Sequence, residues 1–470
     1  MRLFSHLKVN ITLSLLLICS ICLVVILSAR SAVHASGTSL TLTITSGPPT
    51  TSERINGTGF GANERVTINF DTTALTTTTT SSLGAFFVSI KIPATALPGS
   101  HTISAVGQSS GLSAQANFLV RTNWDMFGFI AQHTHWNSYE NVVNTTNVSS
   151  LISGWTASTT NGIASSPAVD SGKVYVGAND GKVYAFNTTT GTSVWTATTG
   201  GAISSSPAVA QGVLYVGSQN GSLYAYNAKN GAFQWSASTG GPITSSPVVT
   251  TGVVYVGSKD GKLYAFNIKT ATTAWTATTG APITSSPAVV NGMVYVGSED
   301  HKVYAFNAKT GASVWSAMLG SSTDSSPSIA NGVLYIGAND NILYAFNAST
   351  GAVLWTATTR GTLVSAPAVA NNIVYVGSND KKLYAFNAKT GLKIWAQATG
   401  AGIVASPTVA NGIVYIGSQD NKLYALNAKT GLVLWTGTAK AAITSSVAVS
   451  DGVIYVGSSS PDDKLYTFHL

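Results

Sequence analysis

Charged residues are scarce in this 470-residue sequence. Lysine, arginine, aspartate and glutamate make up 9% of it, against about 25% in an average soluble domain. The formal net charge is +7, and three of the basic residues (Arg2, Lys8 and Arg30) lie in the first 35 positions, which contain no acid. Of the 24 basic residues, 21 remain beyond that point, dispersed among 17 acidic ones. This small, scattered excess excludes the electrostatic footprint of a nucleic-acid-binding protein.

Cysteine is almost absent, since the sequence has only Cys19 and Cys22. Both lie in the uncharged, mostly apolar run Ile11–Ser28, which follows a basic start and precedes the small-residue segment Ser31–Ser36. This pattern predicts a secretory signal peptide over residues 1–35. The alternative is an uncleaved anchor, because the run is just long enough to span a bilayer. Neither cysteine follows the small residue that lipoprotein processing requires, so lipid attachment is not expected.

Cleavage leaves a mature chain without a thiol. That excludes disulfides, cysteine-ligated zinc and a cysteine nucleophile. We therefore expect an extracytoplasmic protein, secreted or associated with the cell surface, which contacts the membrane only if the first segment is not cleaved. The abundance of glycine (46 residues) and tyrosine (18 residues), together with valine, isoleucine and threonine, is typical of an all-β protein with many turns.

A period of 40 residues runs through the last two thirds of the sequence. Tyrosine and tryptophan both recur on it, and the tryptophans are Trp155, Trp195, Trp235, Trp275, Trp315, Trp355, Trp395 and Trp435. Each unit contains four short predicted strands separated by tight turns, such as Asn291-Gly292. Four antiparallel strands in about 40 residues are typical of one blade of a β-propeller. We interpret the tryptophans as structural contacts between neighbouring blades.

The phase of the repeat predicts how the propeller closes. Eight copies of the first three strands share one phase, but the first tryptophan-bearing strand, Leu151–Trp155, precedes them all, and the last copy ends at Leu470 without one. We therefore predict an all-β, eight-bladed propeller of four-stranded blades over residues 151–470. In it, the N-terminal strand completes the C-terminal blade, which removes exposed sheet edges.

The repeated run G-x-V-Y-V-G-S-x-D-x-K-L-Y-A-F-N-A-K-T-G-x-x-x-W resembles the pyrroloquinoline-quinone (PQQ) repeat. The lead-in from Trp124 to Glu140 also resembles the segment that precedes such propellers. For the quinone dehydrogenases, the resemblance implies bound PQQ, a calcium ion, a catalytic aspartate, adjacent cysteines and long insertions between blades. This sequence has no such insertions and no mature cysteine. We therefore expect no PQQ or calcium, and no catalytic, cofactor-binding or metal-binding residue.

The segment before the propeller is rich in threonine and serine and contains no tryptophan. Alternating runs separated by turns predict a β-sandwich over residues 39–121, and these runs are Leu40–Ile44, Val66–Phe70, Ala85–Ile92, His101–Gly107 and Ala114–Val120. The stretch Gly57–Asp71 resembles bacterial Ig-like surface domains, which implies a spacer or adhesive unit. Residues 122–150 are interpreted as a polar connector.

Few residues in the repeats have the pattern of a chemical site. Six aspartates share one turn position and are interpreted as turn-forming residues; they are Asp180, Asp260, Asp300, Asp340, Asp380 and Asp420. Serine pairs such as Ser165-Ser166 precede the innermost strand, which places them at the mouth of the channel, without partners for a nucleophile. His133 and His135 form an isolated H-x-H pattern, which by itself is a weak metal signal.

Departures from the repeat indicate where one blade differs from the others. At a phase where five blades have glycine, two blades have Arg360 and Lys440, and nearby Asp324 replaces a small or β-branched residue. We predict that Arg360, Lys440 and Asp324 form a partner-binding surface, on the face opposite the regular lysines of the A-K-T-G turns. Two cations there can clamp an acidic group.

Two classes of function follow from the sequence. The first is an exported, monomeric and non-catalytic propeller scaffold that binds a protein or glycan partner at the cell surface. A resemblance to the propeller lipoprotein of the outer-membrane β-barrel assembly machinery supports it. The alternative is a PQQ-dependent quinoprotein oxidoreductase, which requires a pocket that the sequence does not indicate.

Overall fold

The computed structural model describes residues 37–470, so the predicted signal segment lies outside the described residues. Within this range the chain is all-β, as predicted, with one 3-10 turn, η1 (Val148–Ser150), and no α-helix. No helix in the described range is long and apolar enough to cross a membrane. The chain divides into two compact units. One is formed mainly by residues up to 119, and the other by residues 120–470 with the short segment 93–99.

The first unit is the predicted Ig-like sandwich of two antiparallel sheets. One sheet has the order β1-β3-β6, with bounds Ser39–Leu42, Ser52–Thr58 and Phe86–Lys91. The other has the order β2-β8-β7-β4-β5, with bounds Ser46–Gly47, Ser113–Val120, Gly99–Gly107, Arg65–Phe70 and Thr73–Thr79. Burial alternates along β4, where Val66, Ile68 and Phe70 face the core.

Two longer strands of this sandwich, β3 and β5, were not among the predicted runs. The sequence of β3 contains an Asn-Gly pair, which is typical of a turn, and it places Glu53 in the interior. The Glu53 carboxylate is satisfied there, because it accepts the backbone N–H groups of Thr43 and Ile44. The other strand, β5, is a threonine-rich sheet edge without an apolar face. Local hydrogen bonding and position at an edge therefore override the hydrophobic pattern.

The second unit consists of eight sheets, each with four strands of the 40-residue repeat. The innermost strands are β11 (Ala168–Asp170), β15 (Ala208–Ala210), β19 (Val248–Thr250), β23 (Ala288–Val290), β27 (Ser328–Ala330), β31 (Ala368–Ala370), β35 (Thr408–Ala410) and β39 (Ala448–Ser450). The second strands are β12 (Lys173–Gly177), β16 (Val213–Gly217), β20 (Val253–Gly257), β24 (Met293–Ser298), β28 (Val333–Gly337), β32 (Ile373–Ser378), β36 (Ile413–Gly417) and β40 (Val453–Gly457).

The third strands are β13 (Lys182–Asn187), β17 (Ser222–Asn227), β21 (Lys262–Asn267), β25 (Lys302–Asn307), β29 (Ile342–Asn347), β33 (Lys382–Asn387), β37 (Lys422–Asn427) and β41 (Lys464–His469). The outer strands are β14 (Ser193–Thr198), β18 (Phe233–Ser238), β22 (Thr273–Thr278), β26 (Ser313–Met318), β30 (Val353–Thr358), β34 (Lys393–Ala398), β38 (Val433–Thr438) and β10 (Ile152–Ser158). The second and third strands are almost continuously buried, whereas the outer strands are largely exposed.

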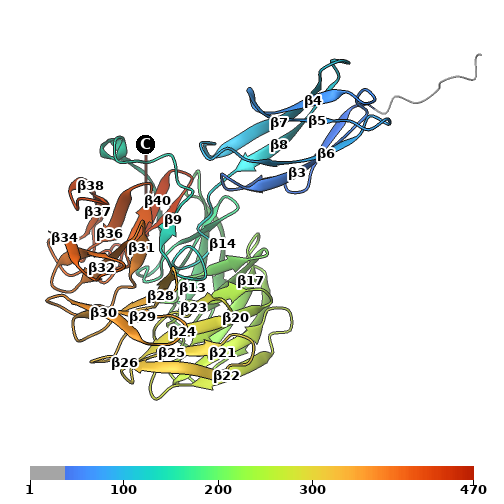
Figure 1. The fold of residues 1–470 in the computed structure, drawn as a ribbon. Helices are drawn as coiled ribbons and strands as arrows, with labels where there is room; N and C mark the ends of the chain where they lie inside the picture. Colours follow the sequence, from blue (N-terminus) through green and yellow to red (C-terminus); the bar gives the residue numbers. More distant parts are fainter. Residues whose placement is uncertain (1–36) are drawn as a thin grey trace, which may run out of the picture. The chain divides into compact units, whose positions relative to one another are not determined.

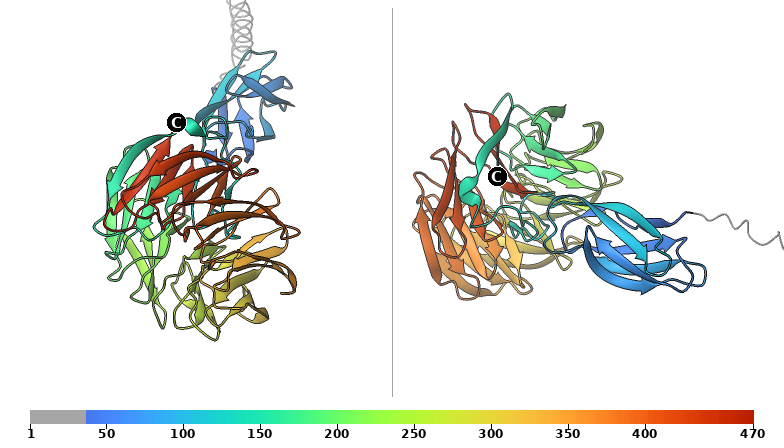
Figure 2. Two further views of the ribbon diagram at one scale, coloured as in Figure 1. Left: turned by 90° about the vertical axis from the view of Figure 1, so that its left-hand side faces the viewer. Right: turned by 90° about the horizontal axis from the view of Figure 1, so that it is seen from above.

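The sheets form a ring (Figure 1; Figure 2). Each innermost strand contacts that of the next sheet, and β39 contacts β11 again. The last sheet has the order β10-β41-β40-β39, so its outer strand comes from the start of the unit and pairs antiparallel with the C-terminal strand. This sheet lacks the turn between third and outer strands that the others have. The buried Tyr415 hydroxyl beside it has no hydrogen-bond partner among the described residues, whereas the equivalent Tyr375 donates to the Ala428 carbonyl.

The tryptophans connect each sheet to the next. Every indole N–H donates to a backbone carbonyl of the following sheet at 2.9–3.1 Å, from Trp155, Trp195, Trp235, Trp275, Trp315, Trp355, Trp395 and Trp435 in turn. The last of these reaches the Leu151 carbonyl, at the start of the unit. It therefore lies beside the seam of the ring, which is the junction where the N-terminal strand β10 pairs with β41. Six of the indoles also pack against a glycine in a turn of the next sheet, whereas the sheet after Trp235 has Ala271 (φ +58°) at this position. At Gly191 (φ +69°), for example, a Cβ atom would lie 2.6 Å from the ring of Trp155, so a larger residue requires the ring to shift.

A circle of serine hydroxyls connects the sheets near the axis. The backbone N–H at one position of the repeat donates to the serine Oγ at the same position of the next sheet, at 2.8–3.1 Å. These hydroxyls belong to Ser206, Ser246, Ser286, Ser326, Ser406, Ser446 and Ser166. The circle is interrupted once, because the position after Ser326 is Ala366. There the Ser325 and Ser328 hydroxyls bond to carbonyls of the next sheet instead. These serines are buried contacts between sheets.

The connector over residues 122–150 is not the simple polar linker that we expected. Its backbone runs along the innermost strands and bonds with Val169, Val209, Val289, Ile329, Val369 and Val409 in turn. Its short strand β9 (Trp136–Asn137) pairs parallel with β35 (Figure 1), and the Asn137 amide donates to the Val449 carbonyl at 2.8 Å. Polar side chains dominate the sequence of this segment, but its backbone and several of its side chains are buried.

The interruption at Ala366 generates a paired prediction. Ser206→Ala leaves the buried N–H of Ser166 without an acceptor and is expected to destabilise the protein by about 1–3 kcal/mol. Ala366→Ser supplies the missing acceptor to Ser326 at a position that other sheets fill with serine. It is expected to stabilise by about 1 kcal/mol. Equilibrium denaturation measures both changes, and a shift of the same sign in both variants contradicts this account of the circle.

The seam generates a second prediction. Ser158 and Lys464 are directly opposed across the seam, as Thr198 and Lys182 are within the first blade. A disulfide between cysteines at the seam positions closes a loop of about 300 residues, against about 16 in the first blade. It should therefore stabilise by about 2–3 kcal/mol more than the matched pair. Unfolding of both oxidised variants, with Cys19 and Cys22 replaced by serine, measures the difference, and equal stabilisation contradicts the role assigned to the seam.

Candidate functional site

Burial alternates along the part of the connector that follows Ala131. His133, His135 and Asn137 are fully buried, whereas Thr134 and Trp136 are partly exposed. The backbone at His133 and His135 is left-handed (φ +55° and +51°), and the alternating burial gives this strip one face toward the interior of the ring and one toward solvent. The hydrogen bonds to Val369 and Val409 fix its register against the innermost strands.

The solvent-facing side of the strip borders a cavity of about 340 Å³, here called the connector groove. Its walls are aromatic and aliphatic, and amide side chains from the turns after β27 and β31 stand at its edge. It is lined by Phe129, Ile130, Thr134, Trp136, Ser138, Tyr139, Ala330, Asn331, Val369, Ala370, Asn371 and Asn372. A second cavity of about 490 Å³ shares Asn331 and extends over the neighbouring turn, where Gln132, Asn291 and Tyr295 line it. No charged side chain lines either cavity.

One residue of the connector groove breaks the repeat. Seven blades have glycine at the second position of the turn between first and second strands, at Gly172, Gly212, Gly252, Gly292, Gly332, Gly412 and Gly452. The eighth has Asn372, held at φ +62°. A side chain in this left-handed conformation is less favourable than glycine, although asparagine tolerates it better than most residues. Our sequence reading missed this departure, although the repeat shows it as clearly as those at Arg360 and Lys440.

Buried polar groups hold the connector in place around the groove. The Asn137 Oδ1 accepts the N–H groups of Tyr139 and Glu140. The Glu140 carboxylate accepts those of Val142, Val143 and Gly452, and burial raises its pKa despite these bonds. Burial also raises the pKa of Asp125 to about 7, to which the neighbouring charge of Asp170 contributes. The groove is therefore built on a fixed backbone.

The structure places the predicted surface residues on three separate blades. The backbone N–H of Arg360 donates to Asp380, and that of Lys440 donates to Asp462, while both side chains are exposed. Asp324 accepts the Thr284 hydroxyl at 2.8 Å. Within residues 37–470 no hydrogen bond or ion pair joins the three, and none of them lines the two cavities. A partner-binding role for Arg360, Lys440 and Asp324 stays a prediction.

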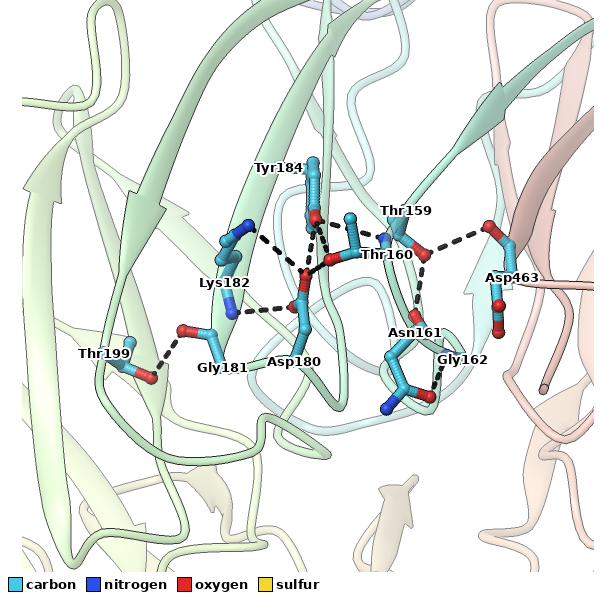
Figure 3. A network of polar contacts seen from close by, with 10 residues as sticks. All are labelled: Thr159, Thr160, Asn161, Gly162, Asp180, Gly181, Lys182, Tyr184, Thr199 and Asp463. Carbon is cyan, nitrogen blue, oxygen red and sulfur yellow. Dashed lines mark hydrogen bonds and ion pairs between the residues drawn. The ribbon is translucent and has the colours of Figure 1, made fainter. Parts of the chain in front are cut away.

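The repeated aspartates have a structural role in the turns. Asp180 accepts the hydroxyls of Thr160 and Tyr184 and the backbone N–H of Lys182, and so joins the turn to the loop that enters the blade (Figure 3). Burial and the bond to Asp180 raise the pKa of Tyr184. The same Asp–Tyr contact recurs at 2.5–2.6 Å in other blades, for example between Asp380 and Tyr384. These carboxylates therefore have a structural role, because their hydrogen bonds hold the turns.

One set of side chains near the axis, those at the repeat position of Asp324, does not supply the groups that PQQ with calcium requires. PQQ is a planar tricarboxylate, so its site must supply cationic or N–H donors, and calcium needs six or more oxygen ligands. On the face away from the connector, the side chains at the phase of Asp324 are Ala164, Ser204, Thr244, Thr284, Val364, Val404 and Thr444. The one charged member of this set, Asp324, is an acid. Nowhere in the described range do three His, Cys, Asp or Glu side chains gather as a metal site requires.

Comparisons with known proteins agree with this architecture. Residues 152–469 match, in four overlapping segments, the family described as outer membrane protein assembly factor BamB, whose repeats are of the PQQ type. Residues 38–120 match the macroglobulin-like domain family. No curated protein sequence matches the chain.

Three solved structures illustrate the likeness. BamB from Moraxella catarrhalis has 20% identity and a TM-score of 0.61, covering 68% of this chain and 100% of its own. A europium-containing methanol dehydrogenase has 16% identity and a TM-score of 0.63, covering 74% and 98%. Quinohemoprotein alcohol dehydrogenase from Comamonas testosteroni has 16% identity and a TM-score of 0.65, covering 74% and 80%.

At these identities the solved structures establish the fold alone, and enzymes as well as an assembly factor share it. The family match is of a different kind, because it spans well over half of the chain. This chain therefore belongs to the PQQ-repeat β-propeller family of outer membrane protein assembly factor BamB, with a macroglobulin-like domain of the Ig type ahead of its propeller.

Proposed function

We propose that this chain is an exported, non-catalytic binding module whose connector groove holds a neutral glycan. The observation that carries the proposal is the lining of the groove, which combines aromatic rings with amide side chains and contains no charge. Its volume is at the lower end of the range for ligand pockets, which suits a short oligosaccharide.

The chemistry of the lining matches that of a sugar. The C–H faces of a pyranose ring pack against aromatic rings, and Trp136 and Tyr139 supply partly exposed ones here. A side-chain amide both donates and accepts, as a hydroxyl group does, and Asn331, Asn371 and Asn372 provide three amides. An acidic or basic ligand lacks a counter-charge in this groove, so a neutral ligand is favoured.

Export and a role as a binding module are supported by separate observations. The segment over residues 1–35 has the pattern of a signal peptide, and the matched family is named for assembly at the outer membrane. The Ig-type domain is a compact unit that can present the propeller. The aspartates of the turns are held by structural hydrogen bonds, which leaves them unsuited to catalysis.

Asn372, which stands where seven blades have glycine, provides the test. Asn372→Gly restores the turn that seven blades have and removes one amide from the groove. It should weaken oligosaccharide binding about tenfold, the effect of one lost hydrogen-bonding group, and change stability by less than about 1 kcal/mol. Titration calorimetry with cellotetraose, maltotetraose and chitotetraose measures the affinity. Unchanged affinity, or no binding of neutral sugars by the wild type, contradicts the proposal.

A matched variant on the opposite face serves as the control. Arg360→Gly with Lys440→Gly also restores the residue that other blades have, and it removes the two predicted cations. It should leave glycan binding unchanged. If this double variant loses the ligand while Asn372→Gly keeps it, the binding surface is the one predicted from the sequence. Capture of a protein partner that neutral sugars do not displace also contradicts the choice of ligand.

The alternative function, a PQQ-dependent oxidoreductase, has its own test. A ligand that binds the native state raises the melting temperature. Because we expect no binding, PQQ with calcium should leave the melting temperature of this protein unchanged. We likewise expect no turnover of alcohols or sugars in a dye-linked assay. A dose-dependent thermal shift accompanied by turnover establishes the enzyme.

A further inference from the structure

The inner face of the connector strip carries two histidines that the glycan proposal does not use. His133 and His135 have no exposed surface. None of their four ring nitrogens has a hydrogen bond of good geometry among the described residues, and the Pro327 carbonyl is near enough to His133 only to interact weakly. The edge of Phe127 packs against both rings, at centroid distances of 5.3 and 4.8 Å, and the two imidazole centroids lie 6.3 Å apart.

Such a pair is unfavourable without a partner. A neutral imidazole has one N–H donor and one lone pair, and each buried group left unpaired costs about 1–3 kcal/mol. Neutral imidazole, with one free lone pair, is the form that binds metals.

We propose that His133 and His135 together bind one copper(I) ion in the interior of the ring. Copper(I) has a filled d shell and accepts two ligands in a linear arrangement. With metal–nitrogen bonds of about 2 Å and ring nitrogens about 1.1 Å from the centroids, two imidazoles on opposite sides of one ion have centroids roughly 6 Å apart. The observed 6.3 Å matches this separation, and a linear ion leaves the angle between the two ring planes free.

The surroundings select a monovalent ion over a divalent one. The desolvation free energy of an ion grows with the square of its charge, so a divalent ion costs roughly four times as much to bury. Zinc and copper(II) offset that cost with three or four protein ligands. Around this pair the described residues place no third His, Cys, Asp or Glu, and Phe127 covers both rings.

The position of the pair determines when the ion can enter. The connector is hydrogen-bonded to innermost strands on both sides of the histidines, at Ile329 and at Val409. The rings are sealed from solvent once those bonds form. Binding is therefore expected during folding, and the folded apo-protein should take up the ion only as fast as the connector opens.

The experiment refolds the full-length chain from denaturant, anaerobically, with copper(I) buffered by bicinchoninate. We expect one copper per chain, with Cys19 and Cys22 changed to serine in every sample so that neither can hold the ion. The absorption edge of the bound copper should have the form typical of two-coordinate copper(I), and its extended fine structure should show imidazole scattering. This spectrum is recorded on otherwise unaltered protein, so the test does not depend on whether the variants fold.

Two variants and a matched control identify the ligands. His133→Leu and His135→Leu should each lower copper(I) affinity roughly tenfold or more. His301→Leu should leave it unchanged, and His301 is a suitable control because it has a positive φ like the other two (70°, against 55° and 51°) but is exposed. Circular dichroism and thermal melting check that each variant is folded.

Several outcomes overturn the inference. Copper at far less than one equivalent after refolding means that ordered water alone satisfies the two rings. Binding that survives in both leucine variants, or a spectrum without imidazole scattering, places the ion elsewhere. Zinc bound more tightly than copper(I) contradicts the selection by charge. None of these results bears on the connector groove, whose ligand is tested separately.

Discussion

The propeller depends on a contact that seven of the eight blades make with the next near the axis, where a backbone N–H donates to a serine hydroxyl at the equivalent position of the following blade. Because the donor is backbone and the acceptor is a short side chain, the distance between neighbouring inner strands is nearly fixed. Equal spacing at every step then determines how many blades fit before the last meets the first. The tryptophans repeat the constraint at the periphery, where each indole bonds to the following blade. Contacts near the axis and at the periphery therefore both fix the spacing between neighbouring blades.

The connector packs against the repeated inner strands, although its own sequence is not a repeat. It follows the inner strands and its backbone hydrogen-bonds with six of the eight as it passes, so its own sequence need not repeat. This arrangement gives the ring an asymmetry that eight similar blades cannot provide. On one side of the strip are the histidines and on the other the connector groove, and both depend on the same register against the blades.

Much of the fold could be predicted from the sequence because the repeat averages over local ambiguity. The phase of the tryptophans and the early strand Leu151–Trp155 indicated that the outer strand of the last blade comes from the start of the domain, and the structure pairs Ile152–Ser158 with β41. The connector occurs once, and its partners lie hundreds of residues away, so no periodicity reveals that it is buried. The strands β3 and β5 were missed because Glu53 and a run of threonines hide the alternation. Asn372, by contrast, was predictable by comparing each turn with its seven counterparts.

The seam has a consequence for biosynthesis. The strand β10 emerges early, but its partner β41 is the last strand of the propeller, so the first element of the ring remains unpaired until the whole propeller sequence has been made. An unfinished or truncated chain has two open edges and no means of covering them, which exposes it to aggregation and proteolysis. A finished chain covers both at once. The ring therefore closes only when all of residues 152–469 have been synthesised.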